Sequence, residues 1–181
     1  MLFKKEGYIV SDIGGTKTVI ALIDSKTNQI VQREYHLNDS IVHYTDTLVR
    51  FINSKECKDY NIKKGCFAVA GPINTDRSEA KLTNHSWTIN KDNILVRTPL
   101  KHVIIINDFE AIGLGINMLE DSEYHELTEL GRNTSGNISV IGAGTGLGVS
   151  ILPYSQKSRI PMQSEGGHVD LPIRIDDKLD V

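Results

Sequence analysis

The hydrophobic pattern of the chain contains one stretch that differs from the rest, at residues 102–109. Its aliphatic residues follow one another without polar alternation and end abruptly at Asn107-Asp108. An uninterrupted apolar run of this kind predicts a strand that is buried on both faces, as a central strand of an α/β sheet is. Asn107 and Asp108 are therefore expected at the carboxyl end of a buried strand, where ligands bind in open α/β folds.

A helix is predicted to follow this strand. Apolar residues recur at helical spacing over 109–119, which indicates a helix with one apolar face. Asp108 at its start also has a plain structural explanation, because aspartate is a favoured N-cap residue. Gly113 and Gly115 inside the helix each cost about 1 kcal/mol relative to alanine, which close packing of this helix between two lobes would explain.

The first hundred residues show shorter patterns that predict a mixture of strands and helices. The predicted elements are, in order, strands at 8–13, 19–23 and 29–37, a helix at 41–52, a short strand at 66–70, a strand at 80–87 and a helical turn at 91–95. Gly14-Gly15 is a typical hairpin turn. The first three strands have no crossover helix between them, so they are expected to be antiparallel.

A second unit with the same outline begins at residue 138. A strand at 138–142 leads into a turn rich in glycine and threonine, and a strand at 149–152 returns, with a third strand at 159–163. We therefore expect a small α/β domain over 1–118 and the start of a larger second domain over 119–181. This second domain is expected to be incomplete and to expose apolar surface on its sheet.

Composition and charge narrow the class of protein. The 181 residues include 39% hydrophobic and 24% charged residues and carry a formal net charge of −3, which is typical of a soluble globular protein. This charge gives no reason to expect nucleic acid or a membrane surface as a partner, and no apolar run approaches membrane-spanning length. Cys57 and Cys66 fit two thiols in a reducing cytoplasm, although their spacing also permits a disulfide.

Two glycine-rich turns are the first candidates for chemistry. Adjacent glycines let backbone N–H groups surround a phosphate, and a threonine hydroxyl adds a donor. Either turn alone could be an ordinary hairpin turn, but two turns that open two similar units predict phosphates held between two lobes. Asp12, just before the first turn, is placed either to hold Mg²⁺ through water or to stabilise the turn. The chain contains no Walker A motif, and Leu147 and Val149 replace glycines that the dinucleotide motif GxGxxG requires.

Polar side chains near residues 107 and 165 suit a polyol. Asn107 and Asp108, together with Glu165 and His168, provide carboxylates and further hydrogen-bonding groups. They include no cluster of cations, which would be expected around an anionic substrate. The alternative for Glu165 and His168 is a solvated acidic loop.

Six segments together resemble the bacterial-type glucokinases of the actin-like, ribonuclease-H-fold sugar kinase superfamily. In the order of that family they are SDIGGT at 11–16, GPI at 71–73, LTNHSW at 82–87, INDFEA at 106–111, GAGTGLG at 142–148 and EGGHVD at 165–170. The resemblance implies an α/β fold of the actin-like ATPase type, with a mixed sheet flanked by helices. The related repressor/open-reading-frame/kinase family shares the GGTK pattern at 14–17, but it carries a cysteine-rich zinc motif after its Glu-x-Gly-His loop. No cysteine follows Cys66 here.

The resemblance also implies a reaction and roles for residues. The reaction is ATP-dependent phosphorylation of glucose at its 6-hydroxyl, with Asp108 as the catalytic base. The implied glucose-binding residues are Asn107, Asp108, Glu165 and His168. The implied ATP-phosphate residues are Ser11, Asp12, Ile13, Gly14, Gly15 and Thr16 in the first turn and Gly144, Thr145 and Gly146 in the second.

Proteins of this family continue well past the length of this chain. The chain is therefore expected to be the amino-terminal portion of a glucokinase, with little or no activity alone, and the full-length enzyme is expected to be a cytoplasmic homodimer. Two other functions fit the same residues. One is a non-catalytic actin-like module, such as a sugar sensor or a pseudokinase fragment. The other is a kinase for another hexose or amino sugar, because recognition of hydroxyl groups depends on loop geometry.

Overall fold

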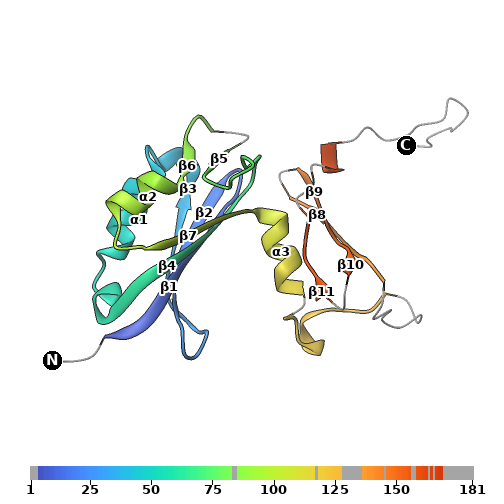
Figure 1. Cartoon of the computed structure of the whole chain (residues 1–181), viewed down its shortest axis with the longest axis horizontal. Coiled ribbons are helices and arrows are strands. Elements are labelled where there is room, and N and C mark those ends of the chain that lie inside the picture. Colours follow the sequence, from blue (N-terminus) through green and yellow to red (C-terminus); the bar gives the residue numbers. More distant parts are fainter. Residues whose placement is uncertain are drawn as a thin grey trace, which may run out of the picture.

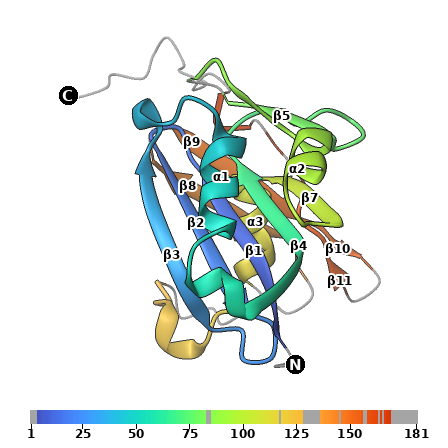
Figure 2. The same cartoon turned by 90° about the vertical axis from the view of Figure 1, so that its left-hand side faces the viewer.

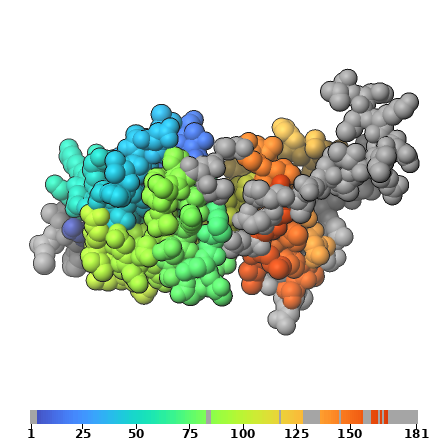
Figure 3. All heavy atoms as spheres, turned by 90° about the horizontal axis from the view of Figure 1, so that it is seen from above, coloured from blue at the N-terminus to red at the C-terminus, as the bar shows by residue number. Residues whose placement is uncertain are grey.

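The chain forms two lobes joined by helix α3 (Asp108–Ile116), as Figure 1 shows. A computed structural model describes residues 4–82, 85–116, 118–127, 136–144, 146–155, 158–162, 164 and 166–168. Among the described residues, the first lobe holds a five-stranded sheet and one short pair of strands, and the second lobe holds two antiparallel pairs. Figure 3 shows the two lobes as two neighbouring masses of atoms. None of the helices in these ranges is long and apolar enough to cross a membrane.

The sheet of the first lobe is mixed. Its strands are β1 (Lys5–Ile13), β2 (Lys17–Asp24), β3 (Ile30–Leu37), β4 (Tyr60–Val69) and β7 (His102–Asn107). Their spatial order is β3-β2-β1-β4-β7. The first three strands are antiparallel to one another, as predicted, whereas β4 runs parallel to both β1 and β7. This parallel register brings Ile13, Val69 and Asn107 to the same edge of the sheet.

Helices α1 (Tyr44–Ile52) and α2 (Lys91–Arg97) cover one face of this sheet (Figure 2). The apolar side of α1 is buried, with Leu48 and Phe51 fully enclosed in the same core cluster as Ile9 and Phe67 of the sheet. Each fully buried aliphatic or aromatic side chain contributes about 1.5–3 kcal/mol, so this layer holds the first lobe together. Asn90 caps α2 by accepting a hydrogen bond from the backbone N–H of Asn93.

Several boundaries differ from the sequence prediction. Helix α1 begins at Tyr44, because a 3₁₀ turn at Asn38–Ser40 precedes it and Ile41 is extended. Strand β4 begins at Tyr60, well before the predicted strand at 66–70. The prediction started too late because the exposed pair Lys63-Lys64 interrupts the apolar pattern of the strand. A second 3₁₀ turn at Glu56–Asp59 leads into this strand. In place of one strand at 80–87, β5 (Glu79–Lys81) pairs with β6 (Thr88–Asn90).

Strand β7 forms as predicted, but its predicted central position is wrong. In the part of the sheet that the structure describes, β7 is an edge strand. Val103 and Ile105 are buried in the core on the side of α2, whereas Ile104 on the opposite face is 58% exposed. Helix α3 contacts the strand and lies beyond its carboxyl end. The uninterrupted apolar run therefore identified a strand correctly, but it did not identify how many neighbours that strand has.

The second lobe repeats the opening hairpin of the first. Strands β8 (Ile138–Ala143) and β9 (Leu147–Leu152) pair in antiparallel register around the second glycine turn. The third strand predicted at 159–163 is not formed by the described residues of that range. There, β10 (Tyr154–Ser155) pairs with β11 (Ser158–Arg159), and Met162 makes a single bridge to Ile151.

Apolar side chains of this lobe are exposed, as the sequence predicted. Ile141 on β8 is 68% exposed. Two short 3₁₀ turns, Asp121–Glu123 and Gly166–His168, lie outside the hairpin. The division into domains at residue 118 stays a prediction.

Candidate active site

A cavity of about 850 Å³ lies between the two lobes. Three parts of the chain form its walls: the end of β1 with the first glycine turn, the junction of β7 with α3, and the second glycine turn. Of the residues predicted for a site, the lining includes Asp12, Gly14, Gly15, Asn107, Asp108, Gly144 and Gly146. Segments that are more than a hundred residues apart in the sequence therefore meet around one space.

The carbonyl groups of the first glycine turn are held from outside the turn. Asn38 donates from Nδ2 to the Gly14 carbonyl at 2.8 Å and from its backbone N–H to the Thr16 carbonyl at 2.9 Å. His85 Nε2 lies 3.2 Å from the Gly15 carbonyl, a hydrogen bond in the tautomer that carries its proton on Nε2. Because these carbonyls are held by neighbouring segments, the turn keeps one shape beside the cavity.

Asn38 is a residue that the sequence prediction missed. It is 1% exposed, and its Oδ1 accepts a hydrogen bond from the Thr18 hydroxyl at 2.8 Å. Buried side-chain amides of this kind are normally fully hydrogen-bonded. The sequence shows only an asparagine after a strand, which is typical of a turn, so nothing local connects it with Gly14.

Not every residue of the first predicted phosphate segment faces the cavity. Ser11 is buried, and its hydroxyl donates to the Val19 carbonyl at 2.8 Å. Ile13 belongs to the hydrophobic core. Successive side chains of a strand point to opposite faces, so Ser11 and Ile13 face the helices while Asp12 between them faces the cavity. Only the backbone of Ser11 and Ile13 could contribute to a phosphate site.

Asp12 is exposed to the cavity, but the surrounding protein removes part of its water. This loss of water raises the pKa of the Asp12 carboxyl above its ordinary value. A carboxylate in such a place favours a neighbouring positive charge. No three His, Cys, Asp or Glu side chains gather in the described part of the chain. Asp12 alone fits Mg²⁺ bound together with a nucleotide, because Mg²⁺ commonly takes one or two carboxylates plus water and substrate phosphates.

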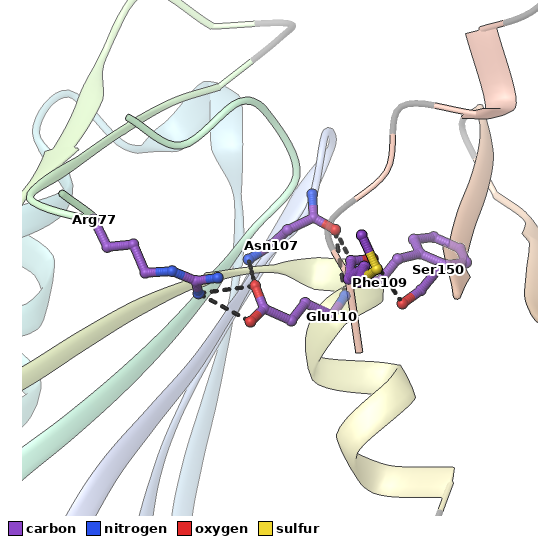
Figure 4. A network of polar contacts seen from close by, with 6 residues as sticks. Arg77, Asn107, Phe109, Glu110 and Ser150 are labelled. Carbon is purple, nitrogen blue, oxygen red and sulfur yellow. Dashed lines mark hydrogen bonds and ion pairs between the residues drawn. The ribbon is translucent and has the colours of Figure 1, made fainter. Parts of the chain in front are cut away.

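Asn107 caps helix α3, so the interpretation of Asp108 as the N-cap is wrong. Asn107 Oδ1 accepts hydrogen bonds from the backbone N–H of Phe109 at 3.0 Å and of Glu110 at 3.3 Å. Glu110 Oε2 accepts in return from the Asn107 backbone N–H at 3.4 Å (Figure 4). This reciprocal pair is a capping box. Asp108 is the first residue of the helix, and its carboxylate accepts from the Phe109 N–H at 3.0 Å.

Phe109 connects this helix to the second glycine turn. Its ring lies against Gly142 and Gly148, which face each other across β8 and β9. A Cβ atom at Gly142 would come within 2.8 Å of Phe109 Cζ, and one at Gly148 would overlap the ring. The glycines outside the turn itself are therefore needed for packing, whatever the turn binds.

Gly113 and Gly115 of the same helix have different surroundings. A Cβ at Gly113 would meet Pro161 at 2.9 Å and Leu152 at 3.2 Å, which confirms close packing between helix and second lobe. Around Gly115 no atom of the described residues, apart from the helix's own backbone, lies within 4 Å of such a Cβ, so they do not bear out the expectation there. Gly115 is a helix glycine that the structure does not explain.

The remaining predicted residues belong to the second lobe. Gly144 donates its backbone N–H to the Gly146 carbonyl at 2.8 Å, which closes the second turn. The backbone of residues 166–168 lies beside the start of β9, with Gly167 against the Leu147 carbonyl. Thr145 and Glu165 lie outside the described residues, as does the side chain of His168. Their roles stay predictions.

The chain matches known proteins over most of its length. The sequence profile of the family named Glucokinase matches residues 9–181. A curated glucokinase from Nostoc punctiforme is 36% identical over 172 residues, which cover 92% of this chain and 48% of that relative. This chain spans about half the length of the curated relatives it matches.

Solved structures share the architecture described above. The crystal structure of a glucokinase from an Antarctic psychrotroph has a TM-score of 0.69 and 25% identity, covering 94% of this chain and 53% of that one. A ROK family glucokinase from Streptomyces griseus, solved in complex with glucose and AMPPNP, has a TM-score of 0.61 and 19% identity. It covers 84% of this chain and 46% of that one, and at this identity it shows the fold alone. The predicted actin-like α/β fold is confirmed.

Proposed function

The chain belongs to the Glucokinase family, and on that premise we propose that this protein transfers the γ-phosphoryl group of ATP to the 6-hydroxyl of glucose. The observation that carries the proposal is the single cavity bordered by Asp108 and by both glycine turns. Transfer of a phosphoryl group to a hydroxyl needs a base beside that hydroxyl and donors around the phosphate oxygens. The lining of this one cavity offers both.

In this proposal the junction of β7 and α3 binds the sugar. The Asp108 carboxylate accepts the proton of the 6-hydroxyl as the sugar oxygen attacks the γ-phosphorus in line. Asn107 uses Oδ1 to cap the helix, so its Nδ2 is directed away from α3 and can donate to a sugar hydroxyl. Glu165 and His168 are proposed to complete the sugar contacts.

The two turns are proposed to bind the phosphates through backbone N–H groups. The first turn offers the backbone N–H groups of Gly15 and Thr16, because the Gly14 N–H already donates to the Lys17 carbonyl at 3.0 Å. The carbonyls of this turn are held by Asn38 and His85. The second turn offers the backbone N–H groups of residues 145 and 146 and the Thr145 hydroxyl, because the Gly144 N–H already donates to the Gly146 carbonyl. Asp12 is proposed to hold Mg²⁺ through water. When bound, this ion neutralises negative charge on the phosphates.

A coupled assay with glucose and ATP tests the proposed reaction on the complete product of the gene. ADP formation that depends on glucose supports it. Glucose binding without phosphorylation, measured by isothermal titration, would instead support the non-catalytic module. A panel of hexoses and amino sugars identifies the substrate, because an amide and a carboxylate alone do not distinguish among sugar hydroxyls. The 181-residue chain assayed alone is expected to turn over slowly or not at all, because its second lobe exposes apolar surface.

We further propose a domain boundary at residue 118, a cytoplasmic location and a homodimer. The boundary is supported by the separation between the five-stranded sheet and the β8–β9 hairpin, with α3 lying between them. Cys57 and Cys66 are free thiols, which is typical of proteins from a reducing compartment. Light scattering of the complete gene product measures the oligomeric state.

A further inference from the structure

Arg77 and Glu110 form an ion pair between segments that are far apart in the sequence. Arg77 Nη1 lies 2.9 Å from both carboxylate oxygens of Glu110. The Glu110 side chain is only 9% exposed, whereas that of Arg77 is 45% exposed. A nearly buried carboxylate needs a compensating charge, and Arg77 is the cation that pairs with Glu110 among the described residues.

The same carboxylate holds Asn107 at the edge of the cavity. Glu110 Oε2 accepts the hydrogen bond from the Asn107 backbone N–H. Asn107 Oδ1 in turn accepts from the backbone N–H groups at the start of α3, which fixes the direction of its side chain. Figure 4 shows Arg77, Glu110 and Asn107 in this order, with the Asn107 Nδ2 end turned away from Glu110. A continuous chain of polar contacts therefore leads from Arg77 to the cavity.

Arg77 is itself held by a well-defined turn. Its backbone has a φ of 55°, in the left-handed region that non-glycine residues rarely adopt. Its N–H donates to the Asn74 carbonyl at 3.0 Å. The side chains of Asn74 and Asp76 both accept from the Ser78 N–H, at 2.9 and 3.1 Å. These bonds maintain an uncommon backbone conformation, so the guanidinium leaves the turn in a fixed direction.

We propose that Arg77 is a positioning residue for Asn107 and Asp108 and acts through Glu110. The inference rests on the proposed function, because that function assigns the sugar to Asn107 and Asp108. Arg77 contacts neither sugar nor phosphate in this scheme. It fixes the Glu110 carboxylate, which keeps the capping box closed and the two polar side chains directed at the cavity. The first glycine turn is held separately by Asn38 and His85, so nucleotide binding is expected to be independent of Arg77.

The kinetic test compares Arg77→Met with Arg97→Met in the complete gene product. Methionine keeps a long apolar side chain and removes the charge. Arg97 is the matched control, because it forms an ion pair with Asp46 at 2.6 Å and is 43% exposed, but it lies outside the cavity. Arg77→Met is expected to lower kcat/KM for glucose by about 10–100-fold, since small misplacements of reacting groups have effects of this size. The KM for ATP should not change, and Arg77→Lys should recover part of the loss because it restores the charge.

Hydrogen exchange at the backbone amides of Phe109 and Glu110 reports the capping box directly and does not depend on turnover. Arg77→Met is expected to accelerate their exchange about tenfold, as for the loss of one charge-assisted hydrogen bond. Arg97→Met should leave it unchanged. Glu110→Gln removes the negative charge of the same ion pair, and it gives a second test if Arg77→Met does not fold.

The outcomes separate this inference from the proposed function. Unchanged exchange in the variants overturns the positioning role, and so do unchanged glucose kinetics in an active enzyme. A wild-type protein that does not phosphorylate glucose overturns the proposed function instead. In that case the exchange measurement still decides whether Arg77 holds the capping box.

Discussion

The ring of Phe109 fills the space that a side chain at Gly148 would occupy. Phe109 follows the proposed base Asp108, while Gly148 belongs to the strand that leaves the second glycine turn. This one contact therefore joins the proposed sugar side of the cavity to the proposed phosphate side. Any movement of the second hairpin relative to α3 must also move this ring.

Gly148→Ala is expected to separate α3 from β9. The added methyl group would overlap the Phe109 ring, and rearrangement of an overpacked site costs about 1–3 kcal/mol. Thermal unfolding measures this loss. Gly146→Ala is the matched control, because no atom of the described part of the chain lies within 4 Å of a Cβ at that position of the same turn. Equal stability of the two variants would contradict the packing described here.

Alanine at Gly113 and at Gly115 is expected to change stability in opposite directions. Gly115→Ala should stabilise the protein by up to about 1 kcal/mol, since alanine favours a helix and the site is open. Gly113→Ala should destabilise it, because the new Cβ would meet Pro161 and Leu152. The midpoint of urea unfolding distinguishes the two. Higher stability in both variants would mean that the helix propensity of alanine outweighs the close contact between Gly113 and the second lobe.

Asn38→Ala is expected to loosen the first glycine turn. It leaves the Gly14 carbonyl without its side-chain donor and the Thr18 hydroxyl without its acceptor, at about 1–3 kcal/mol for each buried group left unpaired. The KM for ATP should rise while the KM for glucose stays unchanged. Asn53→Ala serves as a control, because Asn53 makes one exposed hydrogen bond to Val49. A normal KM for ATP would show that the turn keeps its shape without Asn38.

Asp108→Asn is expected to lower kcat by about 10²–10⁴-fold, the usual contribution of a positioned base. Affinity for glucose should largely survive, because asparagine has the same shape and still accepts from the Phe109 N–H. Steady-state kinetics and isothermal titration on the complete gene product measure the two quantities. Turnover near that of the wild type would refute the assignment of Asp108 as base.

Asp12→Asn is expected to stabilise the ligand-free protein at neutral pH. The pKa of Asp12 is raised in the folded state by loss of water, so ionisation is less favourable there than in the unfolded chain. The destabilisation that ionised Asp12 causes is absent below the ordinary pKa of 3.8, and it develops as pH rises through the higher pKa of the folded state. The variant should therefore raise Tm at about pH 7 but not at about pH 3. An equal rise in Tm at both pH values would contradict loss of water around the Asp12 carboxylate as the cause.

Local signals in the sequence predicted most of the secondary structure. Alternation of apolar residues and the pair Gly14-Gly15 identified the β1–β2 hairpin, because both depend on neighbouring residues only. The edge position of β7 was not predictable in this way. A run of aliphatic residues shows that a strand is apolar, but the exposure of Ile104 depends on which elements cover it.

The residues that line the cavity could be predicted from short sequence motifs, whereas the residues that hold the cavity in shape could not. Asp12 and Asn107 stand beside recognisable turns and strand ends. Asn38 and Arg77 reach their partners across 24 and 33 residues of chain. Such contacts arise from tertiary packing, and a polar residue in a loop carries no periodic signal of its distant partner. The residues that line the cavity were therefore easier to predict than the residues that support them.

Among the residues that the structure describes, the buried core cluster of the first lobe consists of residues between Ile9 and Ile105. All five strands of its sheet lie before α3 in the chain. During synthesis on the ribosome, this lobe can therefore fold before the second hairpin has been translated. Phe109 and Gly113 then already stand on a formed surface when β8 and β9 emerge. The order of translation thus gives an order of assembly, in which the second lobe folds onto the first.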